Sequence, residues 1–289
     1  MCYSACQRAA QSQRPPPWRM IEAMTTEHQP SIGELLREWR ERRRLSQLAL
    51  ALQAEVSPRH LSFLETGRSQ PSRDMTLRLA EQLDVPFRER NLMLLAGGYA
   101  PVYRETALDL PEMSPIRAAV RQLLVGHEPY PALVVDRTWN LIEANAAFAV
   151  FTESAASELL APPCNVLRLA LHPDGLAPRT VNLGEWRAHI LRRLRRAVIR
   201  SGDAELARLL EELRAYPCDQ PEPDADLPGP GDVAVPLRIC HGDRQLAFIA
   251  IIAAFGTPLD ITVAELVIES FFPADPDTAA FLAERARRR

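Results

Sequence analysis

The sequence predicts a multi-domain protein, with an all-α domain over residues 31–98 and an α+β domain over residues 115–289 that holds one antiparallel sheet. Residues 31–98 show dense helical periodicity with short turns. Later residues alternate short β-rich runs with amphipathic helices, in an order that fits one sheet with helices packed against it. Residues 1–30, which are polar and rich in proline, are predicted to be a flexible tail, and residues 99–114 a linker.

The composition narrows the class of protein. Hydrophobic residues make up 47% and charged residues 25% of the 289 residues, which allows ordinary buried cores. No apolar run is long enough to span a membrane and the N-terminus lacks the apolar segment of a secretory signal, so we expect a cytoplasmic protein. The net charge of -3 does not indicate nucleic-acid binding, so a DNA-binding surface would have to be local.

The cysteines predict free thiols and no metal site. Their number is odd and their spacing does not match that of metal ligands; they are Cys2, Cys6, Cys164, Cys218 and Cys240. Reduced thiols are typical of a cytosolic protein.

Capping residues divide residues 31–67 into three short helices. Apolar residues at helical spacing mark the first helix, namely Ile32, Leu35, Leu36 and Trp39. Ser46 is placed to cap a second helix over residues 47–54, and Ser57 to cap a third, whose first residue is Pro58. Gly67 would end the third helix in a left-handed conformation. Two short helices joined by a tight turn leave the second exposed and free to enter the DNA major groove.

This segment resembles the phage-repressor (XRE) helix-turn-helix family. The resemblance rests on Ser46-Gln47, on Val56-Ser57-Pro58-Arg59-His60-Leu61-Ser62-Phe63-Leu64-Glu65-Thr66-Gly67-Arg68 and on Pro71-Ser72. It implies a sequence-specific regulator of transcription that binds double-stranded operator DNA. In that family a glutamine like Gln47 contacts the backbone and neighbouring side chains, and residues placed like Arg68 and Arg73 contact phosphates. The chain departs from the pattern at Pro58, where members often carry a polar side chain.

Exposed residues of the third helix are the predicted readers of bases. Arg59 can bond a guanine edge twice, and Phe63 can contact a thymine methyl. The full predicted DNA-binding set is Gln47, Ser57, Arg59, His60, Ser62, Phe63, Arg68 and Arg73. Because one such helix reads few base pairs, we expect a homodimer on half-sites about 34 Å apart. The arginine run at residues 42–44 fits either a solvated face or a further phosphate contact. The alternative to DNA binding by residues 31–98 is a helical bundle that binds no DNA.

The second domain is predicted from alternating patterns. Strands are expected at 132–135 and 139–144, joined by a tight turn, and again at 233–240, 245–255 and 261–269. Helices are expected at 146–151, 184–201, 204–216 and 279–287, with a proline-rich acidic loop at 217–232.

The opening of this domain, residues 132–148, resembles that of a PAS domain, with two strands and then Glu143-Ala144-Asn145 leading into a helix. The wider pattern resembles the MmyB-like ligand-binding domain that follows this type of helix-turn-helix. Its carriers are Gly98-Tyr99-Ala100-Pro101, Trp139-Asn140, Ala144-Asn145, Asn165-Val166-Leu167-Arg168, His172-Pro173-Asp174-Gly175-Leu176, Asn182-Leu183 and Trp186. The resemblance implies a transcription regulator that senses a ligand, and it does not fix the ligand.

An apolar helix stripe and an apolar strand predict an internal pocket. The strand at 246–255 is apolar on both faces, so both faces should be covered, and its alanines leave room. The predicted lining is Phe148, Trp186, Ile190, Phe248 and Ile252. An elongated apolar ligand such as a fatty acid would fit, its carboxylate held by arginine or histidine. Candidates for that role are Arg168, His172, His189 and Arg193.

The second domain has alternatives to a ligand-sensing function. Apolar stripes more often form plain core than a cavity. No nucleophile elbow, zinc-protease motif, phosphate loop or dinucleotide fingerprint occurs, so no catalytic residue is predicted and an enzyme is not expected. A haem or redox sensor using His172 or the Cys240-His241 pair is one alternative, and a domain that only dimerises is another.

Overall fold

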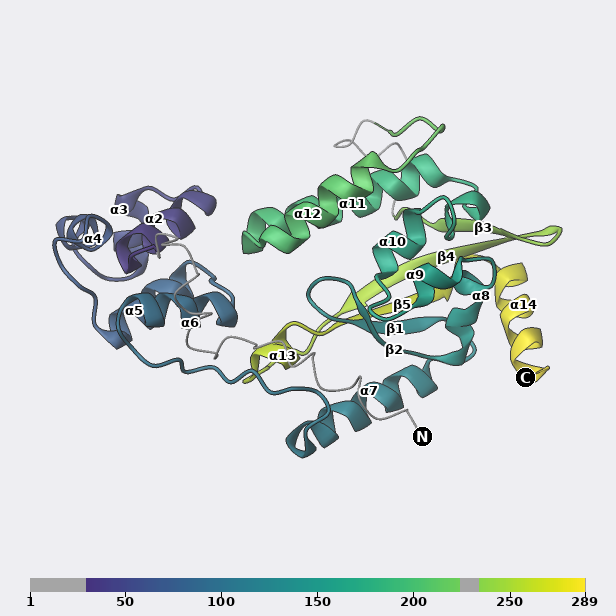
Figure 1. Ribbon diagram of the computed structural model, residues 1–289, viewed down its shortest axis with the longest axis horizontal. Coiled ribbons are helices and arrows are strands. Elements are labelled where there is room, and N and C mark those ends of the chain that lie inside the picture. Colours follow the sequence, from purple (N-terminus) through teal and green to yellow (C-terminus); the bar gives the residue numbers. More distant parts are fainter. Residues whose placement is uncertain (1–29, 224–233, 289) are drawn as a thin grey trace, which may run out of the picture.

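The computed structural model describes residues 30–223 and 234–288. The predicted tail at 1–30 therefore lies outside the described residues except for Pro30, and so do Cys2, Cys6 and the end of the loop predicted at 217–232. A helical lobe stands beside an α+β domain, and the two meet along one side (Figure 1).

Five helices form the first lobe, in agreement with the all-α class predicted for it. They are α2 (Ile32–Arg42), α3 (Gln47–Gln53), α4 (Pro58–Glu65), α5 (Arg73–Gln82) and α6 (Phe87–Ala96). Their apolar faces meet in one core that includes Leu36, Trp39, Leu50, Leu61, Leu64, Leu79 and Met93. Burial of these side chains holds together helices that are too short to be stable alone.

The predicted helix caps are confirmed. The Ser46 hydroxyl accepts from the Ala49 amide at 3.1 Å, and the Ser57 hydroxyl accepts from the His60 amide at 3.1 Å. Pro58 is the first residue of α4, where no amide hydrogen is required. Gly67, just after α4, has φ +71°, a backbone conformation that glycine adopts without a Cβ penalty. The sequence thereby sets both ends of the exposed helix.

One five-stranded antiparallel sheet organises the second domain, as predicted. Its order is β2 (Leu141–Ala144), β1 (Ala132–Val135), β5 (Val267–Pro273), β4 (Arg244–Ala253) and β3 (Leu237–His241). The central strand β5 thus pairs with a strand from the start of the domain. The pairing makes the sheet depend on contacts between distant parts of the chain.

Helices cover both faces of the sheet. On one face lie α10 (Val166–Leu171), α11 (Leu183–Ser201) and α12 (Ala204–Ala215), and on the other lies α7 (Ser114–Gly126) (Figure 1). Helix α14 (Pro276–Arg287) packs against β4 near one end. Short elements fill the connections: η1 (Pro111–Met113), η2 (Ala146–Phe148), α8 (Ala149–Thr152), α9 (Ser157–Leu160), η3 (Ala177–Arg179) and α13 (Ile261–Ala264). The main core lies between the sheet and the α10–α12 layer.

Two expectations about this sheet are wrong. The strand expected at 261–269 begins with the one-turn helix α13, because the Asp260 carboxylate accepts from the Thr262 amide at 2.9 Å and caps a helix there. The strand expected at 245–255 is not covered on both faces. Ile249 and Ile251 are exposed on the outer face, since α7 covers mainly β1 and β5.

Arginines of the first lobe bond directly to the second domain. Arg42 donates to the Ser201 carbonyl and Arg43 to the Arg200 carbonyl, each at 3.2 Å, at the C-terminal end of α11. Cations are favoured at that end of a helix dipole. Gly202 allows the approach, because a Cβ there would lie 1.4 Å from the Arg42 guanidinium. The arginine run therefore contributes to a contact between the two domains in addition to its charge.

Candidate DNA-binding surface and ligand cavity

The outer surface of α4 gathers the predicted base-reading residues. Arg59, in the first turn, is exposed. Phe63 lies one turn later with arginines on two sides: the Arg59 guanidinium is 5.3 Å and the Arg68 guanidinium 5.8 Å from its ring centroid. Such cation–π contacts are worth about 0.5–1 kcal/mol at exposed sites. Phe63 therefore holds two cations at the surface that the sequence predicts to face DNA.

The other predicted DNA-binding residues lie around this group. His60 and Ser62 are half-buried on α4, while Ser57 is exposed and already caps the helix. Arg73 is exposed at the start of α5, directly after its cap Ser72. Their contacts to bases and phosphates stay predictions.

A buried ion pair, which sequence reasoning missed, fixes the back of α4. Glu65, the last residue of α4, accepts from two nitrogens of Arg40 at 2.6 and 2.9 Å. Arg40 also donates to the Leu45 carbonyl at 2.9 Å, and Gln47 donates to Glu65 at 2.8 Å. The hydrogen bond to Glu65 raises the pKa of the Arg40 guanidinium above its usual value. Gln47 thus contacts a neighbouring side chain, as its family resemblance implies.

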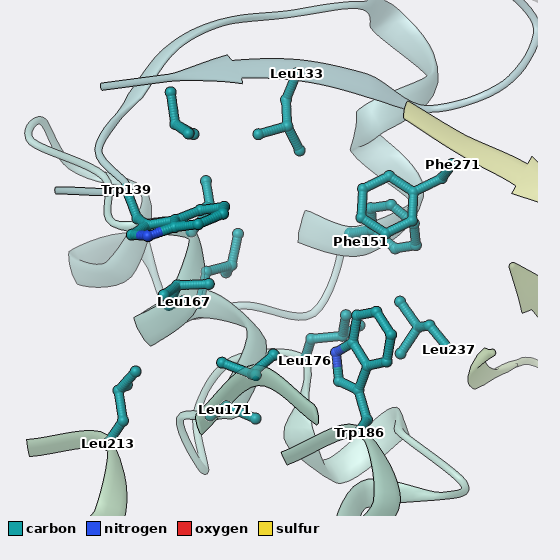
Figure 2. Packing of buried hydrophobic residues seen from close by; sticks show 14 of the residues in the cluster. Leu133, Trp139, Phe151, Leu167, Leu171, Leu176, Trp186, Leu213, Leu237 and Phe271 are labelled. Atoms are coloured by element: carbon teal, nitrogen blue, oxygen red, sulfur yellow. The ribbon is translucent and has the colours of Figure 1, made fainter. Parts of the chain in front are cut away.

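A small apolar cavity of about 40 Å³ lies between the sheet and the α10–α11 layer. Figure 2 shows Trp186 of α11 directed toward the same space as Phe151 and Phe271. Ligand pockets usually measure about 300–1,000 Å³, so this cavity is far smaller in the present conformation. It has room for only a few water molecules, at about 10–15 Å³ each by this measure.

Four of the predicted ligand-binding residues line this cavity: Phe148, Trp186, Ile190 and Arg193. Phe248 is fully buried in the adjoining core, with its ring centroid 5.1 Å from that of Phe151, and it does not line the cavity. Ile252 lies near the last residue of β4, is 43% exposed and does not line the cavity either. The structure therefore places the predicted residues of α11 at the cavity and those of β4 away from it, and their contact with a ligand stays a prediction.

The remaining polar candidates lie outside the cavity lining. Arg168 is engaged by both carboxylate oxygens of Glu212, at 2.7 and 2.8 Å. His172 is half-buried and meets Tyr216 edge to face, with ring centroids 5.0 Å apart. His189 stacks on Trp186, and burial followed by repulsion from Arg193 lowers the pKa of its imidazole to about 4. A neutral His189 supplies no positive charge for a carboxylate near pH 7.

Arg193 has a partner that the sequence analysis missed. Its Nη1 donates to Oε1 of Glu269 at 2.9 Å, and Glu269, on β5, is only 4% exposed. The Arg193 guanidinium also lies 4.2 Å from the ring centroid of Trp139. Trp139 occupies a turn with φ +69°, a rare conformation for a large side chain, fixed by hydrogen bonds to Asp136. The feature of the sequence that could have indicated this partner is Glu269 itself, a single acid within the largely apolar strand β5.

The described residues were also compared with the requirements of a metal site, of a Cys240-His241 sensor and of a membrane span. Among residues 30–223 and 234–288, no three His, Cys, Asp or Glu side chains gather so as to hold a metal ion. Cys240 is an exposed free thiol, while the His241 imidazole lies 3.2 Å from Glu153. Within the same ranges no helix has both the length and the apolar character that crossing a bilayer requires.

A helix-turn-helix lobe joined to an α+β domain with an internal apolar cavity defines a class of protein, the DNA-binding transcription regulators that carry a ligand-binding domain. Comparison with known families makes this specific. The helix-turn-helix domain family matches residues 31–93, and the MmyB-like transcription regulator ligand binding domain family matches residues 116–284, more than half of the chain. The chain therefore belongs to the MmyB-like transcription regulators. No curated protein matches it.

Proposed function

We propose that this regulator binds operator DNA in the cytoplasm as a homodimer through the α4 surface, and that a small, largely apolar ligand entering the α10–α11 cavity controls it without catalysis. The observation that carries this proposal is the cavity itself. Its lining is apolar except for Arg193 and Glu269, and it sits behind α11, whose C-terminal end bonds Arg42 and Arg43 of the helix-turn-helix lobe. A change at the cavity thus has a short physical route to the DNA-binding lobe.

A fatty acid is one candidate ligand, since a long apolar chain matches the lining. The chain would need the aromatic side chains around the cavity to move apart, because 40 Å³ does not hold it. Phe148 and Phe151 line the cavity and come from η2 and α8, elements of three and four residues. They are the side chains that we expect to move.

Thermal melting of protein stripped of lipid tests the ligand. We expect aliphatic acids, alcohols or amides to raise the melting temperature, because filling the cavity stabilises the folded state by about 2.7 kcal/mol at a hundredfold excess over the dissociation constant. Ala170→Leu, on the lining of the cavity, should abolish the shift, and Ala119→Leu, on the exposed face of α7, should preserve it. If no aliphatic compound moves the melting temperature, the apolar-ligand proposal is wrong.

The exposed apolar residues of the outer sheet face support the homodimer. Ile249 and Phe272 are paired neighbours on β4 and β5, Ile251 follows on β4, and all three are exposed. Leu282 of α14 already packs against the core of its own domain. Light scattering should show a dimer that Ile251→Asp weakens. A monomer both with and without operator DNA would contradict the proposal.

A further inference from the structure

The ion pair in the cavity is incomplete. Among the described residues, Glu269 accepts one hydrogen bond, from Arg193, although a carboxylate can accept about four. The Nε of Arg193 is buried and has no hydrogen-bond partner among the described residues. Buried polar groups are nearly always satisfied, and those that are not need an explanation. A buried donor and a buried acceptor thus lie side by side in the wall of an otherwise apolar cavity.

The charges of this pair restrict what can bind beside it. Glu269 neutralises Arg193, so the cavity offers no net positive charge to an anion. A ligand carboxylate that took over Arg193 would leave Glu269, which is 4% exposed, without the one cationic contact that it has among the described residues. Leaving one member of a buried pair uncompensated is strongly unfavourable. An uncharged group that both donates and accepts can instead add to the pair and leave it intact.

We propose that the cavity selects ligands with an uncharged head group that donates a hydrogen bond to Glu269 and accepts one from Arg193, such as a primary amide or an alcohol, on an aliphatic tail. Trp139 supports this geometry, because its ring covers the Arg193 guanidinium and limits the directions from which an acceptor can approach. The inference rests on the proposed function, since it specifies the head group of the apolar ligand.

The test compares ligands that share a chain length and differ in head group. Dissociation constants of decanamide, decanol and decanoate are measured at neutral pH by melting-temperature titration of the full-length protein. We expect decanamide and decanol to bind about tenfold more tightly than decanoate. Glu269→Gln keeps the size of the side chain and leaves the cavity with a net positive charge, so decanoate should become the tightest of the three. Glu212→Gln, which alters the Arg168 pair outside the cavity, should keep the wild-type order.

A second measurement does not depend on the folding of the Glu269 variant. Binding of decanoic acid to the wild-type protein should strengthen from about pH 8 to about pH 6, because the protonated acid can donate to Glu269. Decanoate that binds wild-type protein at least as tightly as decanamide, with no gain at lower pH, would overturn the head-group inference alone. Failure of all three compounds to bind would contradict the apolar-ligand proposal beneath it.

Discussion

Each domain contains a buried arginine–glutamate pair, and the two pairs differ in how completely they are bonded. In the helix-turn-helix lobe, Glu65 accepts from Arg40 twice and from Gln47 once, and Arg40 also caps the Leu45 carbonyl. In the ligand-binding domain, Arg193 and Glu269 share one hydrogen bond, and the Arg193 Nε has no partner among the described residues. Both glutamates are less than a tenth exposed.

The difference separates a structural role from a binding role. The Arg40–Glu65 pair is satisfied by the protein itself, so it fixes the position of α4 and needs nothing else. The Arg193–Glu269 pair retains unused hydrogen-bonding capacity next to a cavity, which is costly unless a ligand or water uses it. A buried ion pair therefore indicates a binding site only when some of its hydrogen-bonding atoms have no partner within the protein.

The largest expected effect comes from breaking the satisfied pair. Glu65→Ala removes both hydrogen bonds from Arg40 to a buried carboxylate and leaves it the exposed Glu41 carboxylate at 3.7 Å, so we expect the helix-turn-helix lobe to lose about 3–5 kcal/mol of stability. Gln47 also loses its partner. Thermal or urea unfolding followed by circular dichroism measures the loss, and operator binding should fall with it because α4 is no longer fixed.

Glu41→Ala is the matched control for Glu65. Glu41 pairs with Arg37 one helical turn away at the surface, where water screens the interaction, and its exposed carboxylate also lies 3.7 Å from Arg40. Unfolding of this variant should be nearly unchanged. Equal effects of the two substitutions would show that the Arg40–Glu65 pair is not the anchor of α4.

Local sequence signals predicted the first lobe well because its elements depend on neighbouring residues. Ser46, Ser57, Pro58 and Gly67 act within three or four residues of their own positions, so caps and turns could be predicted one at a time. The Arg40–Glu65 pair spans 25 residues, and no local pattern announces it.

The cavity depends on pairings that are distant in sequence. Arg193 and Glu269 are 76 residues apart and meet only because β5 pairs between β1 and β4. The cavity lining includes Trp186 and Ile190 of the helix stripe but not Ile252, which is 43% exposed, because tertiary packing sets which residues of a strand the helices cover.

The residues of the second domain that carry the family resemblance have two different roles. Asn145, Asn165 and Asn182 each bond backbone groups of other segments and do not line the cavity. Four other carriers do line the cavity, namely Val166, Leu167, Leu176 and Trp186, while Arg193 and Glu269, the pair proposed to select the head group, lie outside the motif.

The smaller expected effect concerns the exposed end of α4, the helix whose buried end carries Glu65. Arg59→Ala should leave the melting temperature nearly unchanged, because the side chain is exposed, and should cost about 1–3 kcal/mol of operator binding with relaxed preference at one base pair. Arg73→Ala is the comparison: as a predicted phosphate contact, it should weaken operator and random DNA alike and reduce the salt slope by about one unit.

Titration of operator and random duplexes at several salt concentrations separates the two roles. Arg208→Ala, an exposed arginine on α12, controls for the loss of one positive charge and should change neither measurement. If Arg59→Ala binds both duplexes as tightly as the wild type, α4 is not the recognition helix. If it weakens both equally, Arg59 contacts phosphate and the reading of bases must lie with His60, Ser62 or Phe63. Either result would leave the structural role of Glu65 at the other end of α4 untouched, since Glu65 and Arg40 are buried in the lobe.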